Sequence, residues 1–465
     1  MNFDLVIKNG IIVNNDNIQK KDIGIIADKI VNISNDLMYK ENTVVIDASD
    51  KYIFPGGVDV HTHLDLSINI ANNIISTKDD FLSGTIAAAH GGTTTIIDHC
   101  FQNKGETLRD ALNRWHSKAQ PAVIDYGFHI NISDFNKRVI DDIPALIQEG
   151  YISYKIYMAY SFMLNDEEIL KLLTCTKNHG GLVCVHAENY HIIKYMTNKL
   201  IFEGNISPRY HPVSRPTIAE SEATYRIIKL AELTSSLLYI VHVSCNRALL
   251  EISKARKSKI NIIGETCPQY LLLSDEQYEL PNFQGAKYIL SPPLRNRYNQ
   301  ECLWKGLREG NLSTVATDHC AFNFKGDKDI NTNGNFTDIP NGIPGIELRL
   351  PLIFNFGVLQ NKITLQQFVN ITSTNPAKIF GLYPKKGTIS LGSDADIVIF
   401  DPKIKKTIKQ SILHENVDYT PYENMIITGY PILTISRGCI IVDEGVFIGK
   451  IGNGRFLPMN NPQYL

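Results

Sequence analysis

Between residues 57 and 317 the chain alternates strand-like apolar runs with segments of helical periodicity. Several runs are nearly continuous in aliphatic and β-branched residues, which is typical of parallel strands buried on both faces. The eight runs are Gly57–His61, Thr93–Asp98, Asp125–Ile130, Ile152–Ala159, Leu182–His186, Leu238–His242, Ile260–Glu265 and Leu312–Thr317. Between them, Asn165–Glu168 and Thr217–Glu220 have the spacing of helix capping boxes, and Gly180 is placed to end a helix. Eight strand–helix units predict an α/β fold of the (β/α)8 TIM-barrel type.

Both ends of the chain follow another pattern, with short apolar runs separated by turn-prone residues. Neither end has enough runs for a sandwich core, so we expect the two ends to pair into one small β-sandwich domain. The predicted domains are residues 1–54 and 381–465 for the sandwich and its tail, and residues 55–380 for the barrel. The segment Asn323–Asn335, rich in Gly, Lys, Asp and Asn, is expected to be an exposed loop.

Composition narrows the possible functions. Lys and Arg total 46 against 48 Asp and Glu, so no basic excess supports a nucleic-acid partner. No apolar run reaches the ~18 residues of a membrane span, and the first ten residues lack the pattern of a signal peptide. We therefore predict a cytoplasmic protein without a membrane partner. The eight cysteines form no C-x-x-C pair and are expected to be reduced and mostly buried.

Histidines at strand ends give the strongest chemical signal. His61 and His63 are two residues apart on one strand, so both imidazoles face one side and can bind one metal ion. Taken alone, the pair favours a metal ligand, with a solvent-facing pair of strand-end histidines as the alternative. However, His186, His242 and Asp318 each close another predicted barrel strand. Because the carboxyl ends of barrel strands meet at one mouth, these side chains together predict a metal centre.

Lys155 interrupts an otherwise apolar strand. A buried ammonium beside divalent cations would be repelled and would cost several kcal/mol to desolvate. The amine could extend to solvent from the strand end. Alternatively, the neutral amine could add carbon dioxide and become a carbamate, an anion able to bridge two metal ions. The surrounding histidines and Asp318 favour the carbamate.

The other histidines are expected to be structural. His99 and His319 each follow a strand-terminal aspartate, so side-chain alternation predicts that they point to the opposite face. His129 ends a strand and has no obvious partner. The four cysteines near strand ends are expected to be small buried side chains and not thiolate ligands.

Taken together, the motifs resemble the dihydropyrimidinase and D-hydantoinase family of the amidohydrolase superfamily, and the likeness extends over the whole chain. The motifs that carry it are His61-Thr62-His63, Lys155 with Met158-Ala159-Tyr160, His186-Ala187-Glu188-Asn189, His242-Val243-Ser244-Cys245, Glu265–Leu271, Ser291–Arg295, Thr317–Cys320 and Asn341–Glu347.

The resemblance implies two divalent metal ions per chain, expected to be zinc, bridged by a CO2-derived carbamate on Lys155. One ion is expected on His61, His63, Lys155 and Asp318. The other is expected on His186, His242 and Lys155. The family pattern also implies a homotetramer or a homodimer.

The resemblance further implies the roles of three residues that bind substrate. Tyr160 would donate to the oxyanion that develops during the reaction. Backbone groups at Ser291 and Asn341 would hold the ring amide and its neighbouring carbonyl. Asp318 would carry a proton from the attacking water to the leaving ring nitrogen.

These features predict a cyclic amidase that converts a dihydropyrimidine or a 5-substituted hydantoin, with D-configuration favoured, into an N-carbamoyl amino acid. Allantoinase and dihydroorotase share the metal chemistry and are the alternatives. A non-catalytic scaffold relative is more remote, because all six ligand positions are present.

The chain departs from the family pattern in the segments after His63 and after Tyr160, which puts the substrate's exocyclic group in doubt. Dihydroorotase-like chains have a carboxylate-binding arginine two residues after the second histidine, where this chain has Asp65. Repulsion there favours a neutral cyclic ureide. An apolar exocyclic group is expected against Leu64, Leu66, Tyr157, Phe162 and Met163.

Overall fold

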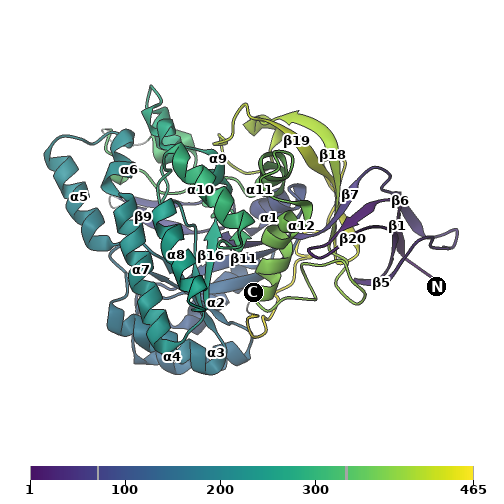
Figure 1. Cartoon of the computed structure of the whole chain (residues 1–465), viewed down its shortest axis with the longest axis horizontal. Coiled ribbons are helices and arrows are strands. Elements are labelled where there is room, and N and C mark those ends of the chain that lie inside the picture. The colour runs from purple at the N-terminus through teal and green to yellow at the C-terminus, as the bar shows by residue number, and fades with distance from the viewer. Residues whose placement is uncertain (1, 71–72, 330–333, 464–465) are drawn as a thin grey trace.

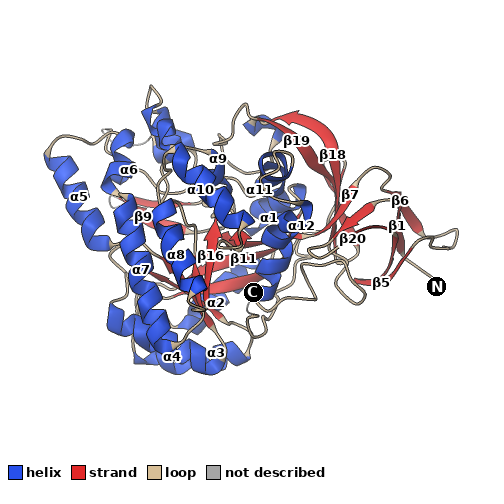
Figure 2. Ribbon diagram, viewed as in Figure 1, coloured by secondary structure: helices blue, strands red, loops and turns tan. Residues whose placement is uncertain are grey.

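The computed structural model describes residues 2–70, 73–329 and 334–463 and has two parts (Figure 1). The larger part contains eight parallel strands surrounded by helices, in the order β17-β16-β15-β14-β13-β12-β11-β8 (Figure 2). The strands are β8 (Gly57–Thr62), β11 (Thr93–Phe101), β12 (Asp125–Asn131), β13 (Ser153–Tyr157), β14 (Leu182–His186), β15 (Leu238–Ile240), β16 (Ile262–Thr266) and β17 (Thr314–Val315). Each predicted run overlaps one of these strands, so the predicted barrel is confirmed.

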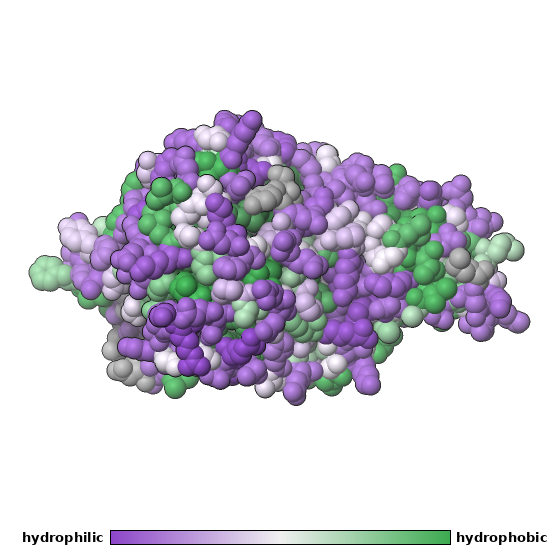
Figure 3. Space-filling view, turned by 90° about the horizontal axis from the view of Figure 1, so that it is seen from below, coloured by the Kyte–Doolittle hydropathy of each residue, from purple (hydrophilic) through white to green (hydrophobic). Residues whose placement is uncertain are grey.

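Helices cover the outside of the barrel (Figure 2). They are α1 (Phe81–His90), α2 (Leu108–Ala119), α3 (Lys137–Gln148), α4 (Asp166–His179), α5 (Tyr190–Phe202), α6 (His211–Ser214), α7 (Thr217–Thr234), α8 (Asn246–Lys257), α9 (Pro268–Leu272), α10 (Arg297–Arg308), α11 (Arg349–Ile353), α12 (Leu365–Val369) and α13 (Asn375–Ile379). The face in Figure 3 is largely hydrophilic with scattered apolar groups. Within the described ranges, no helix combines the length and the apolar character needed to cross a membrane.

The helix boundaries confirm one predicted capping box and contradict the other. Helix α4 begins with reciprocal bonds between Asn165 and Glu168, and it ends at Gly180, whose φ of 85° suits glycine. Helix α7 has no side-chain cap at its start. Glu220 instead accepts hydrogen bonds from Ser244 and Arg295, because a buried carboxylate is better satisfied by these donors than by a helix end.

Side chains help to close the barrel between its first and last strands. The ladder between β8 and the segment after β17 is reduced to one bridge, Thr62 with His319. Beside it, the backbone N–H and the hydroxyl of Thr317 donate to the Asp59 carboxylate at 3.1 and 2.6 Å. Arg349, fully buried, donates to the carbonyls of Val58 on β8 and Val315 on β17 at 3.2 and 3.1 Å.

The smaller part contains strands from both ends of the chain, as the predicted β-sandwich requires (Figure 1). One sheet has seven strands in the order β21-β20-β19-β18-β7-β2-β3, and the other has four in the order β5-β4-β1-β6. The strands from the N-terminal end are β1 (Leu5–Lys8), β2 (Ile11–Val13), β3 (Ile18–Lys20), β4 (Asp22–Ile26), β5 (Lys29–Ser34), β6 (Val44–Asp47) and β7 (Tyr52–Pro55). Those from the C-terminal end are β18 (Ile397–Thr407), β19 (Ile426–Ser436), β20 (Cys439–Asp443) and β21 (Val446–Phe447). The domain limits at residues 54/55 and 380/381 stay a prediction.

The segment Asn323–Asn335 is only partly the exposed loop that its composition predicts, since Lys325 and Gly326 are exposed but other residues are buried. Lys328 is fully buried, and Asp327 is 7% exposed. Carbonyl oxygens satisfy the buried Lys328 amine, which a composition argument cannot foresee. Residues 330–333 of this prediction lie outside the described residues.

A buried charge network connects the barrel with residues next to the C-terminal strands β18 and β19. Lys386 Nζ lies 2.6 Å from Asp125 on β12, 3.0 Å from Asp394 and 2.6 Å from Asp396. Arg437, just after β19, lies 3.0 Å from the other oxygen of Asp125. The three carboxylates could otherwise hold a metal ion, but the lysine occupies the position between them. Burial alone would lower the pKa of Lys386, and the three carboxylates raise it above its usual value instead.

Lys386→Met should lower the free energy of unfolding by about 3–5 kcal/mol, the scale for removing one partner of a buried ion pair. The deficit should shrink as the pH falls, because protonation removes the unpaired negative charges. Denaturant and thermal melts measure both effects. Lys403→Met removes an exposed amine 3.4 Å from Asp50 and is the control, which should melt with the wild type. An unchanged melting temperature for Lys386→Met would contradict the network's role.

Candidate metal centre

The predicted site residues come from distant parts of the chain and line one cavity. Its volume of about 500 Å³ suits a small molecule. Its lining includes His61, His63, Lys155, Tyr160, His186, His242, Ser291, Asp318 and Asn341. These positions follow from the fold, because the histidines, Lys155 and Asp318 lie at or near the carboxyl ends of barrel strands.

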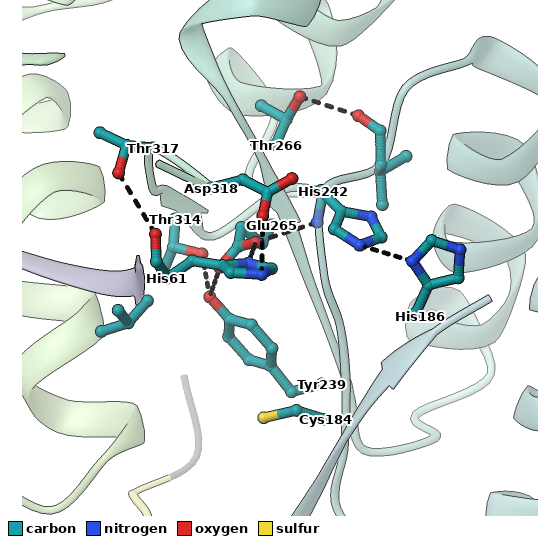
Figure 4. Close-up of polar contacts among 12 residues, drawn as sticks. His61, Cys184, His186, Tyr239, His242, Glu265, Thr266, Thr314, Thr317 and Asp318 are labelled. Carbon is teal, nitrogen blue, oxygen red and sulfur yellow. Dashed lines mark hydrogen bonds and ion pairs between the residues drawn. The ribbon is translucent and has the colours of Figure 1, made fainter. Parts of the chain in front are cut away.

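The potential ligand atoms form two neighbouring groups. His61 Nε2 and His63 Nε2 each lie 3.1 Å from Asp318 Oδ1. On the other side, His186 Nδ1 and His242 Nε2 face each other at 3.0 Å (Figure 4). His61, His242 and Asp318 offer ligand atoms that all lie within 4.8 Å of one another. The arrangement can therefore hold cations between side chains from opposite sides of the mouth.

Three site residues adopt a backbone conformation that is uncommon outside glycine. The φ angles are 72° at Tyr160, 38° at His242 and 52° at Asp318. A side chain in this region is strained, and surrounding structure must hold it there. With this backbone conformation, all three side chains line the cavity.

Two buried glutamates orient the imidazoles, and the sequence interpretation assigned neither this role. Glu265, at the end of β16, accepts from His61 Nδ1 at 2.7 Å and from the backbone N–H of His242 at 2.9 Å (Figure 4). Glu188 accepts from His186 Nε2 at 2.8 Å and is bound by Arg215 at 2.5 Å. Burial would raise the pKa of Glu188, but Arg215 and His186 lower it to about 2. The sequence contained two signals for these roles. Glu265 ends a predicted strand, and Glu188 lies two residues after His186.

These hydrogen bonds determine which ring nitrogen each imidazole presents to the cavity. A carboxylate on Nδ1 of His61 leaves Nε2 of that ring free to bind, and the reverse holds for His186. Burial also lowers the pKa of His61 and His242 well below the usual range, with the nearby Lys155 adding to the effect. The rings are therefore neutral and offer lone pairs at neutral pH.

Several buried nitrogens in the cavity lack hydrogen-bond partners. Across the described ranges, this is true of Lys155 Nζ, His63 Nδ1 and His242 Nδ1. Burial lowers the pKa of the Lys155 amine to about 8. Unpaired buried polar atoms are rare and costly unless a ligand or ion completes them. Unpaired nitrogens grouped around one carboxylate fit a metal centre better than a hydrogen-bonded polar core.

The expectation that His99 points away from the site is wrong. Its ring lies 4.6 Å from the His61 ring and stacks on His63 at 4.7 Å, inside the barrel. Asp98 points outward instead, where it accepts from Trp115 and Thr62. Both faces of β11 are buried, so apolar patterning could not show which face is inside.

His129 also has partners that the sequence did not reveal. Its Nε2 lies 2.8 Å from the Val60 carbonyl and its Nδ1 lies 2.6 Å from the Ser153 hydroxyl. His319 keeps its predicted direction away from the site and lies 3.1 Å from Asp79. All eight cysteines are free, and most are buried.

The walls of the cavity agree only partly with the expected apolar set. Leu66, Tyr157 and Phe162 line the cavity, together with Ile68 and further residues of β9 (Ser67–Ile70). Leu64 is buried against helix α1, and Met163 lines a neighbouring cavity.

Asp65 does not face the substrate space as the charge argument required. It is absent from the cavity lining and lies 3.5 Å from Lys118. Its φ of 50° shows that the chain turns at this position.

Comparison with known proteins places the chain in a family. The sequence profile of the amidohydrolase family matches residues 52–438. The D-hydantoinase of Geobacillus stearothermophilus is 48% identical over 97% of this chain and 96% of its own. The D-hydantoinase of Ralstonia pickettii is 43% identical over 98% of both chains. The crystal structure of dihydropyrimidinase from Brevibacillus agri NCHU1002 superposes with a TM-score of 0.96 at 46% identity, over 99% of both chains. The chain belongs to the amidohydrolase family, within its group of D-hydantoinases and dihydropyrimidinases.

Proposed function

We propose that this protein is a metal-dependent cyclic amidase that adds water across the ring amide of a 5-substituted D-hydantoin or a dihydropyrimidine, giving an N-carbamoyl amino acid. The observation that carries the proposal is that one cavity brings together imidazole nitrogens without hydrogen-bond partners, one carboxylate and one buried amine. Relatives named D-hydantoinase and dihydropyrimidinase match nearly the whole chain and support the same chemistry.

Two divalent ions, proposed to be zinc, would be held by the side chains already described. His61, His63 and Asp318 would bind one ion. His186 and His242 would bind the other, and a carbamate on Lys155 would bind both. When bound, such ions lower the pKa of a water molecule and polarise the carbonyl under attack. The carbamate needs a neutral amine, and the lowered pKa of Lys155 makes that form accessible near neutral pH.

The protein's own groups would manage the protons and the developing charge. Asp318 would take a proton from the attacking water and return it to the ring nitrogen as the C–N bond breaks. Burial raises the pKa of Tyr160, so its hydroxyl stays protonated and can donate to the oxyanion. Ser291 and Asn341 lie together, with Ser291 Oγ donating to Asn341 Oδ1 at 3.1 Å, and would hold the ring amide.

The cavity favours a neutral substrate for a reason that does not involve Asp65. Among the described residues that line it, Lys155 is the one cationic side chain and arginine is absent. A carbamate would convert even that cation to an anion. Dihydroorotate would then meet no cationic side chain for its carboxylate. Allantoin is neutral but rich in hydrogen-bonding groups, which suits the apolar walls formed by Leu66, Ile68 and Phe162 less well.

Two further features belong to this proposal. We propose a homotetramer or a homodimer, since helix α5 exposes Tyr195, Ile201 and Phe202, the last of them 92% exposed. We also propose a cytoplasmic location, which the free cysteines support.

The proposed activity predicts an order of substrates. A 5-substituted hydantoin or dihydrouracil should have the highest kcat/KM, with allantoin lower and dihydroorotate lowest. Hydrolysis of phenylhydantoin, dihydrouracil, allantoin and dihydroorotate, measured side by side on purified holoenzyme, tests the order. Dihydroorotate as the best substrate would contradict the charge argument, and allantoin as the best would contradict the argument from apolar walls.

Lys155→Ala should remove the bridging group and most of the bound metal. Elemental analysis measures metal per chain, and a short added carboxylic acid should restore part of the activity by filling the gap. Wild-type protein supplied with ¹³C-bicarbonate should give a carbamate carbon signal that the variant lacks. Lys104→Ala, an exposed lysine of the neighbouring cavity, is the control and should keep its metal. Two metals per chain and full turnover in Lys155→Ala would exclude the carbamate.

The variant Asp318→Asn separates the role of Asp318 in metal binding from its role in proton transfer. It should lower kcat at least ~10²-fold, the scale of general acid–base catalysis. Part of the metal should remain on the histidines, which elemental analysis of the same sample would measure. Near-normal turnover would remove Asp318 from the proton pathway.

A further inference from the structure

Lys328 is a fully buried lysine outside the metal centre, and its amine has two well-defined partners. Nζ donates to the carbonyl oxygens of Ile289 and Pro340, both at 2.9 Å. The neighbouring Asp327 carboxylate does not bind it and instead lies 3.1 Å from Lys78. The amine thus serves two backbone carbonyls and no acid among the described residues.

The two carbonyls belong to the segments that carry the proposed ring-amide groups. Ile289 is two residues before Ser291, and Pro340 directly precedes Asn341. The segments also touch each other, since the Gly342 N–H donates to the Ile289 carbonyl at 3.0 Å. Lys328 therefore connects the two sides of the cavity wall at which the substrate ring would be held.

Other buried side chains hold the same backbone on either side of Ser291. His211 Nε2 lies 2.8 Å from the Leu290 carbonyl, and the Tyr270 hydroxyl donates to the Pro292 carbonyl at 2.7 Å. Within the described part of the chain, the backbone N–H and C=O of Ser291 itself bind no protein group. The carbonyls of Leu290 and Pro292 thus have partners, while the backbone N–H and C=O of Ser291 stay available to a ligand.

We propose that Lys328 is a positioning residue that sets the separation of Ser291 and Asn341, and thereby the affinity for the substrate's ring amide. The assignment rests on the proposed function. The side chain does not line the cavity, so it acts through the two loops and not on the substrate.

Lysine suits this role in either protonation state. Burial lowers the pKa of Lys328 to about 7. The ammonium has three N–H groups and the neutral amine has two, so each form can donate to both carbonyls. An apolar side chain of the same length would leave the buried Pro340 carbonyl without a donor and the Ile289 carbonyl with the Gly342 N–H alone, and the two loops would move apart.

The test compares Lys328→Met with Lys328→Arg in the holoenzyme. Lys328→Met should raise KM for a 5-substituted hydantoin at least about tenfold while kcat stays within about threefold and metal content is unchanged, the signature of lost substrate binding. Lys328→Arg keeps donors for both carbonyls and should recover part of the KM. If Lys328→Met is insoluble, Lys328→Gln, which keeps amide N–H groups, should show a smaller rise in KM.

Lys386→Met is the matched control, since it also removes a fully buried lysine but lies at the amino ends of the strands. It should lose stability with KM unchanged. If Lys328→Met likewise loses stability without any change of KM, the positioning role is overturned. A wild-type enzyme that hydrolyses no cyclic ureide would overturn the proposed function instead, which the same assay distinguishes.

Discussion

Burial of the side chains at the barrel mouth is the constraint on which the site depends. Burial keeps the imidazoles of His61 and His242 neutral, and it lowers the pKa of the Lys155 amine. In water these groups would be hydrated and partly protonated, and they would repel cations. Once buried, each of them keeps a nitrogen without a hydrogen-bond partner, an arrangement that is costly until an ion or a covalent change completes it. The ability to bind metal is thus a consequence of packing as well as of residue type.

The same packing explains why many buried polar side chains support the proposed metal ligands. Glu265 binds both His61 and the backbone of His242, so one carboxylate relates the two sides of the centre. Asp59 and Arg349 hold the closing strands together within the same buried layer. Because β17 spans two residues, a regular ladder alone could not fix the position of the residues that follow it. Buried side chains supply the rigidity that metal ligands need.

The barrel and the members of the site could be predicted from the sequence because each rests on a local and repeated signal. A long apolar run ending in His186 or Asp318 places that residue at the mouth whatever the surrounding details. The two failures have different causes. For His99, alternation was correctly expected, but nothing in a strand buried on both faces shows which side is inside. For Lys328, a polar composition indicated a loop, whereas pairing with distant carbonyls decided its burial.

Three buried lysines show that the environment, and not the residue type, determines the chemistry. Burial acts on all three in one direction, since it disfavours the charged amine. Lys386 lies among three carboxylates, which outweigh burial and keep it a cation that joins the barrel to the sandwich. Lys328 has two carbonyls, so it needs donors but no charge. Lys155 has neither a carboxylate nor a carbonyl as a hydrogen-bond partner, and its amine lies beside histidines at an open cavity. Of the three, it is therefore the one whose surroundings favour reaction with an electrophile such as carbon dioxide.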